Sequence, residues 1–283
     1  SDVCSSDLSG MFEGCASVLA LDVSGFDMTR ARDISSMFDG CASLTELDLS
    51  NFETPQLTEI SRVFAGCSGL SSISLGGIDT SNVENFSGLF AGNTTLVNID
   101  ISALNTERAT NMAEMFKECA SVDSLELGNF DTTNVTNMSS MFEGATNLQV
   151  LNIESFTTDN VTDMSKMFKD CSMLQNIDVS RFNTTFVGNF TEMFSGCDNV
   201  ESLGLGSFNT ASITDGSKLN GMFAEADKLE IVTLGTGFAR LDGTDIFKGD
   251  TSLEIVISPS YELLPLSNNL FNGADSAVLY VPD

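Results

Sequence analysis

The sequence contains no histidine and no tryptophan, and it is poor in basic residues. Without histidine the chain has no imidazole for acid–base catalysis, for a Ser-His-Asp triad or for metal binding. Its 283 residues include 12 Lys and Arg against 40 Asp and Glu, which gives a net charge of −28 at pH 7. Such a chain repels phosphate, which excludes nucleic acid as a natural partner. No run of apolar residues is long enough to span a membrane, so we expect no membrane insertion of this segment.

A 26-residue repeat runs through the whole sequence. Phenylalanine recurs every 26 residues over eight copies, and the series continues at Phe223, Phe247 and Phe271 with intervals of 29, 24 and 24. A branched aliphatic residue stands six residues after each regular phenylalanine, and alternating apolar residues such as Leu47 and Leu49 follow it. This alternation is typical of a short strand. The regular phenylalanines, which we expect to stack in the core, are Phe12, Phe38, Phe64, Phe90, Phe116, Phe142, Phe168 and Phe194.

The segment before each phenylalanine predicts a short helix or a helical turn. In residues 134–144 the apolar side chains fall at positions 135, 138, 141 and 142, and Gly144 follows as a left-handed cap would. A single unit of strand and turn cannot enclose its own apolar face, so the copies must stack as a solenoid. We therefore predict an α/β repeat of about eleven coils, each with one strand of a parallel sheet. At a strand spacing of about 4.8 Å the sheet would be roughly 50 Å long.

Six cysteines and a row of threonines occupy fixed places in the repeat. The cysteines stand three residues after the phenylalanine, with Asn93 and Ala145 in that place in two coils. One shared phase predicts buried free thiols, while a disulfide between adjacent coils, such as Cys171 with Cys197, remains an alternative. No C-x-x-C spacing occurs, so we predict no metal site and no cofactor. The cysteine column is Cys15, Cys41, Cys67, Cys119, Cys171 and Cys197. The threonines, expected to cap turns and to bond between coils, are Thr54, Thr80, Thr106, Thr132, Thr158, Thr184 and Thr210.

The two ends of the sequence differ from the regular repeat. Residues 1–8, which include Cys4, match one reading frame of a common sequencing-library adapter, so we expect them to be an artefact and not native. The remaining residues 9–283 are predicted to form one solenoid, with regular repeats over 9–235 and divergent repeats over 236–283. Pro259, Pro265 and Pro282 lie in this last part. We expect the natural protein to continue at both ends.

The repeat unit resembles that of a known family. The stretch Asn-Phe-Asp-Thr-Thr-Asn-Val-Thr-Asn-Met-Ser-Ser-Met-Phe-Glu-Gly at 129–144, followed by strands such as 44–50, is similar to the 26-residue repeat of BspA-like leucine-rich-repeat surface proteins of bacteria. The likeness covers about residues 9–235, and residues 271–282 resemble a second repeat type of the same proteins. It implies a leucine-rich-repeat solenoid in a secreted or wall-anchored bacterial protein, often an adhesin. The family has no shared catalytic residues.

Positions 8, 10 and 12 after each phenylalanine are predicted to face solvent, and they carry carboxylates without any Lys or Arg. Three explanations remain open: a solvated acidic surface that prevents aggregation, a cationic protein partner, or bound divalent cations. Cations are the least favoured, because no EF-hand loop or G-G-x-G-x-D repeat occurs. The candidate binding residues are Asp22, Glu46, Asp48, Asp100, Glu126, Glu154 and Asp178.

These observations favour a non-catalytic function. Asp22 with Asp48, or Asp100 with Glu126, would be spaced for a polysaccharide hydrolase, but these acids recur with the repeat and no Trp or Tyr platform accompanies them on this face. We therefore expect a monomeric, extracellular, adhesin-like ectodomain that binds a host or neighbouring-cell surface or matrix protein. The alternatives are a structural stalk that presents another domain and, less favoured, a polysaccharide-acting enzyme.

Overall fold

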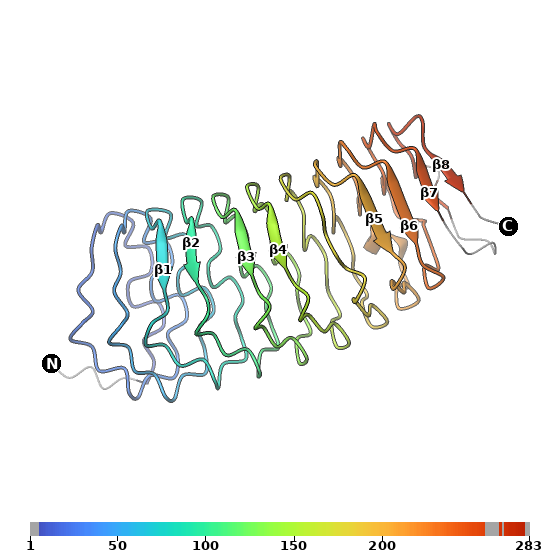
Figure 1. Cartoon of the computed structure of the whole chain (residues 1–283). Helices are drawn as coiled ribbons and strands as arrows, with labels where there is room; N and C mark the ends of the chain where they lie inside the picture. The colour runs from blue at the N-terminus through green and yellow to red at the C-terminus, as the bar shows by residue number, and fades with distance from the viewer. Residues whose placement is uncertain (1–5, 258–265, 268, 281–283) are drawn as a thin grey trace.

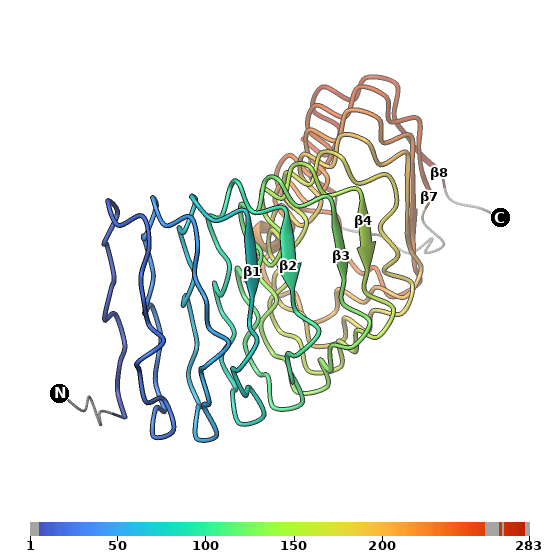
Figure 2. The same cartoon turned by 60° about the vertical axis from the view of Figure 1, so that its left-hand side comes forward.

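The structure, a computed structural model, describes residues 6–257, 266–267 and 269–280. The chain winds into coils that stack in a single row, with the two ends of the chain at opposite ends of that row (Figure 1). The strands lie along one side of the row, as both views show (Figures 1 and 2). This stacking of coils with the strands on one side confirms the predicted leucine-rich-repeat solenoid. No helix among the described residues is long and apolar enough to cross a membrane.

Stacked phenylalanine rings form the centre of the solenoid. The eleven phenylalanines of the repeat, from Phe12 to Phe271, stack with ring centroids 4.9 to 6.1 Å apart. Phe38 to Phe194 are completely buried, whereas Phe12 in the first coil is partly exposed. Phe223, Phe247 and Phe271 continue the same stack although their spacing in the sequence is irregular. One continuous core thus extends through regular and divergent repeats alike.

The strands are short, parallel and grouped in three sheets. Strands β1 and β2 pair, β3 and β4 pair, and β5 to β8 form a four-stranded sheet in chain order. Within the described part of the chain there is one 3₁₀ helix, Gly216–Leu219, and it precedes β6. The strand bounds are β1 Ser72–Ser74, β2 Asn98–Asp100, β3 Ser124–Glu126, β4 Val150–Asn152, β5 Ser202–Leu205, β6 Ile231–Leu234, β7 Ile255–Ile257 and β8 Val278–Tyr280.

One uninterrupted sheet was expected, and at one of the interruptions, between β2 and β3, two acids occupy adjacent strand ends. Asp100 ends β2 and Glu126 ends β3, and within the described residues these two strands do not pair. Glu126 does pair with the neutral Asn152, whose Nδ2 donates to Glu126 Oε2 at 3.1 Å. Like charges on neighbouring strands repel, so pairing is favoured where one partner is neutral. The four-stranded sheet has no acid in this row, and its β-branched residues favour strand geometry.

Turns, and before Phe223 the short 3₁₀ helix Gly216–Leu219, occupy the described segments before the repeat phenylalanines, and none of these segments is an α-helix. In the second coil the N–H groups of Ser36 and Phe38 donate to carbonyl groups of the next coil, while Met37 donates three residues back to Ile34. Alternate N–H groups are thus unavailable for helical bonds. Ser36 also has a φ of 53°, in the left-handed region that ends a right-handed helix. Of the two predicted possibilities, helix or turn, the chain adopts the turn, and Gly144 has the expected positive φ of 73°.

The cysteine column is buried and unbridged. Its six cysteines are free, and all except the partly exposed Cys15 are fully buried. The Cys67 thiol donates to the Phe38 carbonyl of the preceding coil at 3.1 Å, and the other buried members make the same bond. Burial raises the pKa of Cys67 and Cys119 to about 12. The prediction of free thiols is confirmed for these residues, and Cys4 lies outside the described residues.

Two polar residues replace cysteine in that column. Asn93 Nδ2 donates to the carbonyl oxygens of Phe64 and Phe90, at 2.7 Å each. Asp250 is completely buried; its Oδ1 accepts from the Ala226 N–H at 2.8 Å, and its Oδ2 has no hydrogen-bond partner. Burial raises the pKa of Asp250 to about 8, so this carboxyl is mostly protonated at neutral pH.

The threonine row joins neighbouring coils through hydrogen bonds. Thr132 Oγ1 donates to the Thr157 carbonyl at 2.8 Å and accepts from the Thr157 N–H at 2.7 Å. All seven predicted threonines are buried, and each forms at least one such bond with the next or the preceding coil. The predicted role of this row is confirmed.

The first described residues take part in the fold. Leu8 is buried in the core, and Asp7 forms a parallel bridge with Asp33. The origin of residues 1–8 in an adapter stays a prediction, and residues 1–5, Pro259, Pro265 and Pro282 lie outside the described part.

Replacing Thr132 by valine should destabilise the solenoid. Valine keeps the volume but leaves the amide of the half-buried Thr157 without its partner, which costs about 1 kcal/mol. Urea unfolding followed by circular dichroism would measure this loss. Thr133→Val, at the exposed neighbouring position, is the matched control and should change stability by less than about 0.5 kcal/mol. Equal stability of the two variants would contradict the structural role of the threonine row.

Replacing Asp250 by asparagine should stabilise the protein above neutral pH. The folded pKa lies above that of an unfolded aspartate, so wild-type stability falls as pH rises from about 4 to about 8. Asparagine keeps the bond from Ala226 and cannot ionise. We expect a gain of at least about 1 kcal/mol near pH 9 and a much smaller difference near pH 5, from urea unfolding at both pH values. Asp123→Asn, at an exposed site whose charge does not act on Asp250, should show no such pH-dependent gain.

Candidate functional site

The predicted binding residues share one surface, the outer side of the strand row, called here the sheet face. Along each strand, side chains point alternately into the core and out to solvent. In β1, for example, Ile73 is buried between the exposed Ser72 and Ser74. All seven predicted acids are exposed on this face: Asp22, Glu46, Asp48, Asp100, Glu126, Glu154 and Asp178. The structure therefore places them where the repeat predicted, and their role in binding stays a prediction.

Most aspartates of the sheet face also hold the turn that follows. Asp48 Oδ1 accepts from the Ser50 N–H at 2.9 Å, and Asp22, Asp100 and Asp178 accept in the same way from the serine two residues on. These hydrogen bonds hold the pKa of all four carboxyls below the usual range. Asn152 makes the same turn with its Oδ1, which accepts from the Glu154 N–H. The aspartates are thus fixed, ionised acceptors.

The acids do not form one unbroken row. Asp22 and Asp48 lie on neighbouring coils, because a bridge joins Ala20 to Glu46 two residues before them. Ser74 pairs with Asp100. Of the two acidic pairs considered for hydrolysis, Asp22 and Asp48 each accept a hydrogen bond within a turn. Asp100 and Glu126 lie on β2 and β3, which do not pair within the described residues.

A cation at the edge of the sheet face corrects the expectation of a purely anionic surface. Arg181 donates from Nη1 to the Glu154 carbonyl oxygen at 3.0 Å. With Asn152, Glu154 and Asp178 it lines a hollow of about 400 Å³, and its charge contributes to the lowered pKa of Asp178. Arg181 stands 13 residues after Phe168, one residue beyond the last of the positions 8, 10 and 12 that were predicted to face solvent. The prediction of a surface without Lys or Arg therefore missed it.

The last coils turn the sheet face apolar, which was not predicted. Ile231, Ile255 and Val278 are in register on β6, β7 and β8, with 37%, 36% and 59% of their surface exposed. Tyr280 on β8 is 54% exposed and pairs with Ile257. The β-branched residues at outward strand positions were visible in the sequence, but the irregular repeat spacing there concealed their register. This set is called the aliphatic row below.

No group of three or more His, Cys, Asp or Glu among the described residues is arranged to hold a metal ion. The sheet face therefore offers two kinds of contact, fixed carboxylates over its first seven coils and exposed aliphatic side chains over its last ones.

Several solved structures are similar to this chain in fold. A leucine-rich cell surface protein of Faecalibacterium prausnitzii is 16% identical, and the match covers 96% of this chain and 74% of that protein's chain with a TM-score of 0.46. A leucine-rich-repeat protein of Bacteroides ovatus is 17% identical, with coverages of 95% and 79% and a TM-score of 0.39. One of T. pallidum is 24% identical, with coverages of 59% and 69% and a TM-score of 0.42. A search of curated proteins gives no significant match.

A family model described as "Mycoplasma protein of unknown function, DUF285" matches residues 6–126, 60–151 and 121–233. These overlapping segments follow the regular repeats and end close to residue 235, where the divergent repeats begin. The resemblance to BspA-like proteins thus holds at the level of the leucine-rich repeat, and the matching family has another name. Since the matched segments together extend from residue 6 to residue 233, the chain belongs to the DUF285 family.

Proposed function

We propose that the chain is a non-catalytic, protein-binding ectodomain of a bacterial surface protein, which acts like an adhesin and binds a host or neighbouring-cell surface or matrix protein. The observation that carries this proposal is the sheet face, where fixed carboxylates continue into the exposed aliphatic row. The extracellular location rests on the resemblance of the repeat to bacterial surface proteins.

The two parts of the sheet face suit two steps of protein recognition. Carboxylates on a strongly acidic chain attract a basic partner and align it, which raises the association rate at low salt. Exposed aliphatic and aromatic side chains supply the apolar contacts that dominate binding energy at interface centres. Ile231, Ile255, Val278 and Tyr280 provide these contacts within one sheet, where the backbone is fixed by strand pairing.

The state of the acids supports a non-catalytic role. A glycosidase needs one carboxylic acid that is still protonated near neutral pH, and therefore one with a raised pKa. On the sheet face, hydrogen bonds from Ser24 and Ser50 lower the pKa of Asp22 and Asp48. The continuous phenylalanine stack favours a second candidate, a rigid stalk, because a core without a break resists bending between coils.

Neutralising the acids of the sheet face should weaken binding. A variant with Asp22→Asn, Asp48→Asn, Asp100→Asn, Glu126→Gln and Asp178→Asn keeps the turn acceptors, as Asn152 shows in the natural chain. Against a panel of immobilised host matrix proteins, we expect slower association and at least a tenfold loss of affinity at low salt, about 1.4 kcal/mol. Surface plasmon resonance at two salt concentrations would measure both. Unchanged affinity and salt dependence would exclude the acids as the contact.

Interrupting the aliphatic row should act on dissociation instead. Ile255→Ser removes the central member, and we expect dissociation of the captured protein to become about tenfold faster with little change in association rate. Val97→Ser, an exposed aliphatic residue outside the row, is the matched control and should bind like wild type. A wild-type protein that retains nothing from the panel would favour the stalk. Turnover of a polysaccharide that is lost in the neutralised variant would favour the enzyme.

A further inference from the structure

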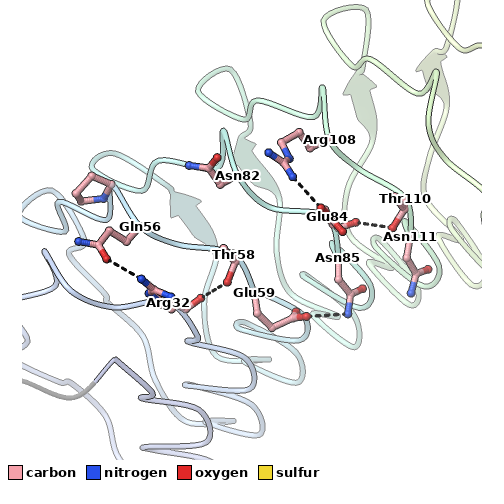
Figure 3. A pocket seen from close by; sticks show the side chains of 11 residues that line it. Arg32, Gln56, Thr58, Glu59, Asn82, Glu84, Asn85, Arg108, Thr110 and Asn111 are labelled. Carbon is pink, nitrogen blue, oxygen red and sulfur yellow. Dashed lines mark hydrogen bonds and ion pairs between the residues drawn. The ribbon is translucent and has the colours of Figure 1, made fainter.

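A polar groove lies on a different side of the coils from the sheet face. It is lined by residues that precede the repeat phenylalanines by five to nine positions, and it spans coils two to five with a volume of about 790 Å³ (Figure 3). A second hollow of about 510 Å³ shares Glu84, Arg108 and Thr110 with it and extends it to Asn134 and Asn160. Together they form one groove, called here the amide groove, across six successive coils.

Amides and hydroxyls line much of this groove, and the Nδ2 groups of Asn134 and Asn160 donate to the carbonyl oxygens of Glu107 and Thr133 in the preceding coil. The row eight residues before each phenylalanine reads Arg30, Gln56, Asn82, Arg108, Asn134, Asn160 and Phe186. Two residues later the hydroxyls of Thr58, Thr110 and Thr136 donate to carbonyl oxygens of the preceding coil, at 3.1, 3.2 and 3.1 Å. The groove walls are therefore held in place, while the exposed amide of Asn82 has no hydrogen-bond partner among the described residues and is free for a ligand (Figure 3).

Arg32 is a cation without a carboxylate partner. Its Nη2 contacts Gln56 Oε1 at 3.5 Å, and it forms no ion pair with any described residue. Arg108, farther along the groove, pairs with Glu84 at 3.0 Å, but both side chains are more than half exposed, so the pair is weak. In a chain with a net charge of −28, two guanidinium groups that line one groove form a local exception to the acidic surface.

We propose that the amide groove binds an acidic oligosaccharide that carries carboxylates at intervals along its length. Guanidinium groups bind carboxylates through paired hydrogen bonds, and planar amides bind hydroxyl and acetamido groups in both directions. Glu59 and Glu84 also lie in the groove, where Glu59 accepts from the Ser61 N–H and from Asn85 Nδ2 and Glu84 pairs with Arg108. A ligand with a charge on every sugar would be repelled by these acids, so the anionic groups must be sparse.

The chemistry of the groove favours a sugar over a peptide. Peptide sites use apolar anchors or unpaired strand edges, whereas Pro55 is the one apolar side chain in the lining and the groove carbonyls already accept from threonines. Phe186 continues the row of Asn134 and Asn160 in the next coil and is 62% exposed. It lies one coil beyond Asn160, outside the lining of both hollows, and offers an aromatic face to a ligand that extends past the groove.

Hyaluronan hexasaccharide, with one carboxylate on every second sugar, is the probe of choice, and the chitin hexasaccharide is its neutral counterpart. Titration calorimetry should show binding of the first and at least tenfold weaker binding of the second. Arg32→Gln should reduce hyaluronan affinity about tenfold, since it removes charge-assisted hydrogen bonds. Asn82→Ala should reduce it less. Both side chains are exposed, and thermal melting would verify that the variants fold as wild type does.

Two controls keep this site separate from the sheet face. Arg181→Gln and the neutralised sheet-face variant should bind hyaluronan as wild type does, so failure of the adhesin proposal leaves this result unaffected. No heat of binding for hyaluronan, or binding that Arg32→Gln does not weaken, would overturn the proposal. Tighter binding of a glutamate-rich peptide, or of a heparin hexasaccharide, would also overturn it, in favour of an acidic peptide or a densely charged polyanion.

Discussion

The structure depends on equivalent residues of successive coils being in contact. A buried phenylalanine ring has another ring above and below it, and a buried threonine hydroxyl finds its partners on the backbone of the adjacent coil. Both interactions exist only if each coil places the same side chain at the same height, which is why one turn of backbone takes 26 residues so regularly. Where the spacing changes, after Phe194, the ring stack is maintained, and the longer interval before Phe223 contains the 3₁₀ helix Gly216–Leu219.

The rows that face the core were predictable because burial acts on every copy in the same way. A column of phenylalanine, cysteine or threonine has one physical explanation, and its members confirm one another. The choice between helix and turn was not predictable in this way. Met138, Met141 and Phe142 have the spacing of a helix face, and only the left-handed φ of 56° at Ser140 and the inter-coil bonds decide for a turn. A serine in that conformation carries no signal in the sequence.

Surface features were harder to predict, because they depend on contacts between coils that differ from one copy to the next. The break between β2 and β3 places two acids, Asp100 and Glu126, at adjacent strand ends, whereas the break after β4 has the neutral Asn152 on one side. The aliphatic row and the amide groove each need the register of several coils before their members can be seen together. Net charge was also misleading as a guide to the whole surface, since screening confines each charge to about 8 Å at physiological salt and Arg32 and Arg181 therefore act locally.

The separation of the sheet face into an acidic and an aliphatic part has an evolutionary consequence. Unequal recombination between near-identical repeats in the gene would add or remove a whole unit, and the new coil would insert without disturbing any buried row. Each insertion between the two parts would move them apart by about 4.8 Å. The number of repeats then sets the distance between the two contact regions. A lineage can adjust this distance to a changing partner without altering any contact residue.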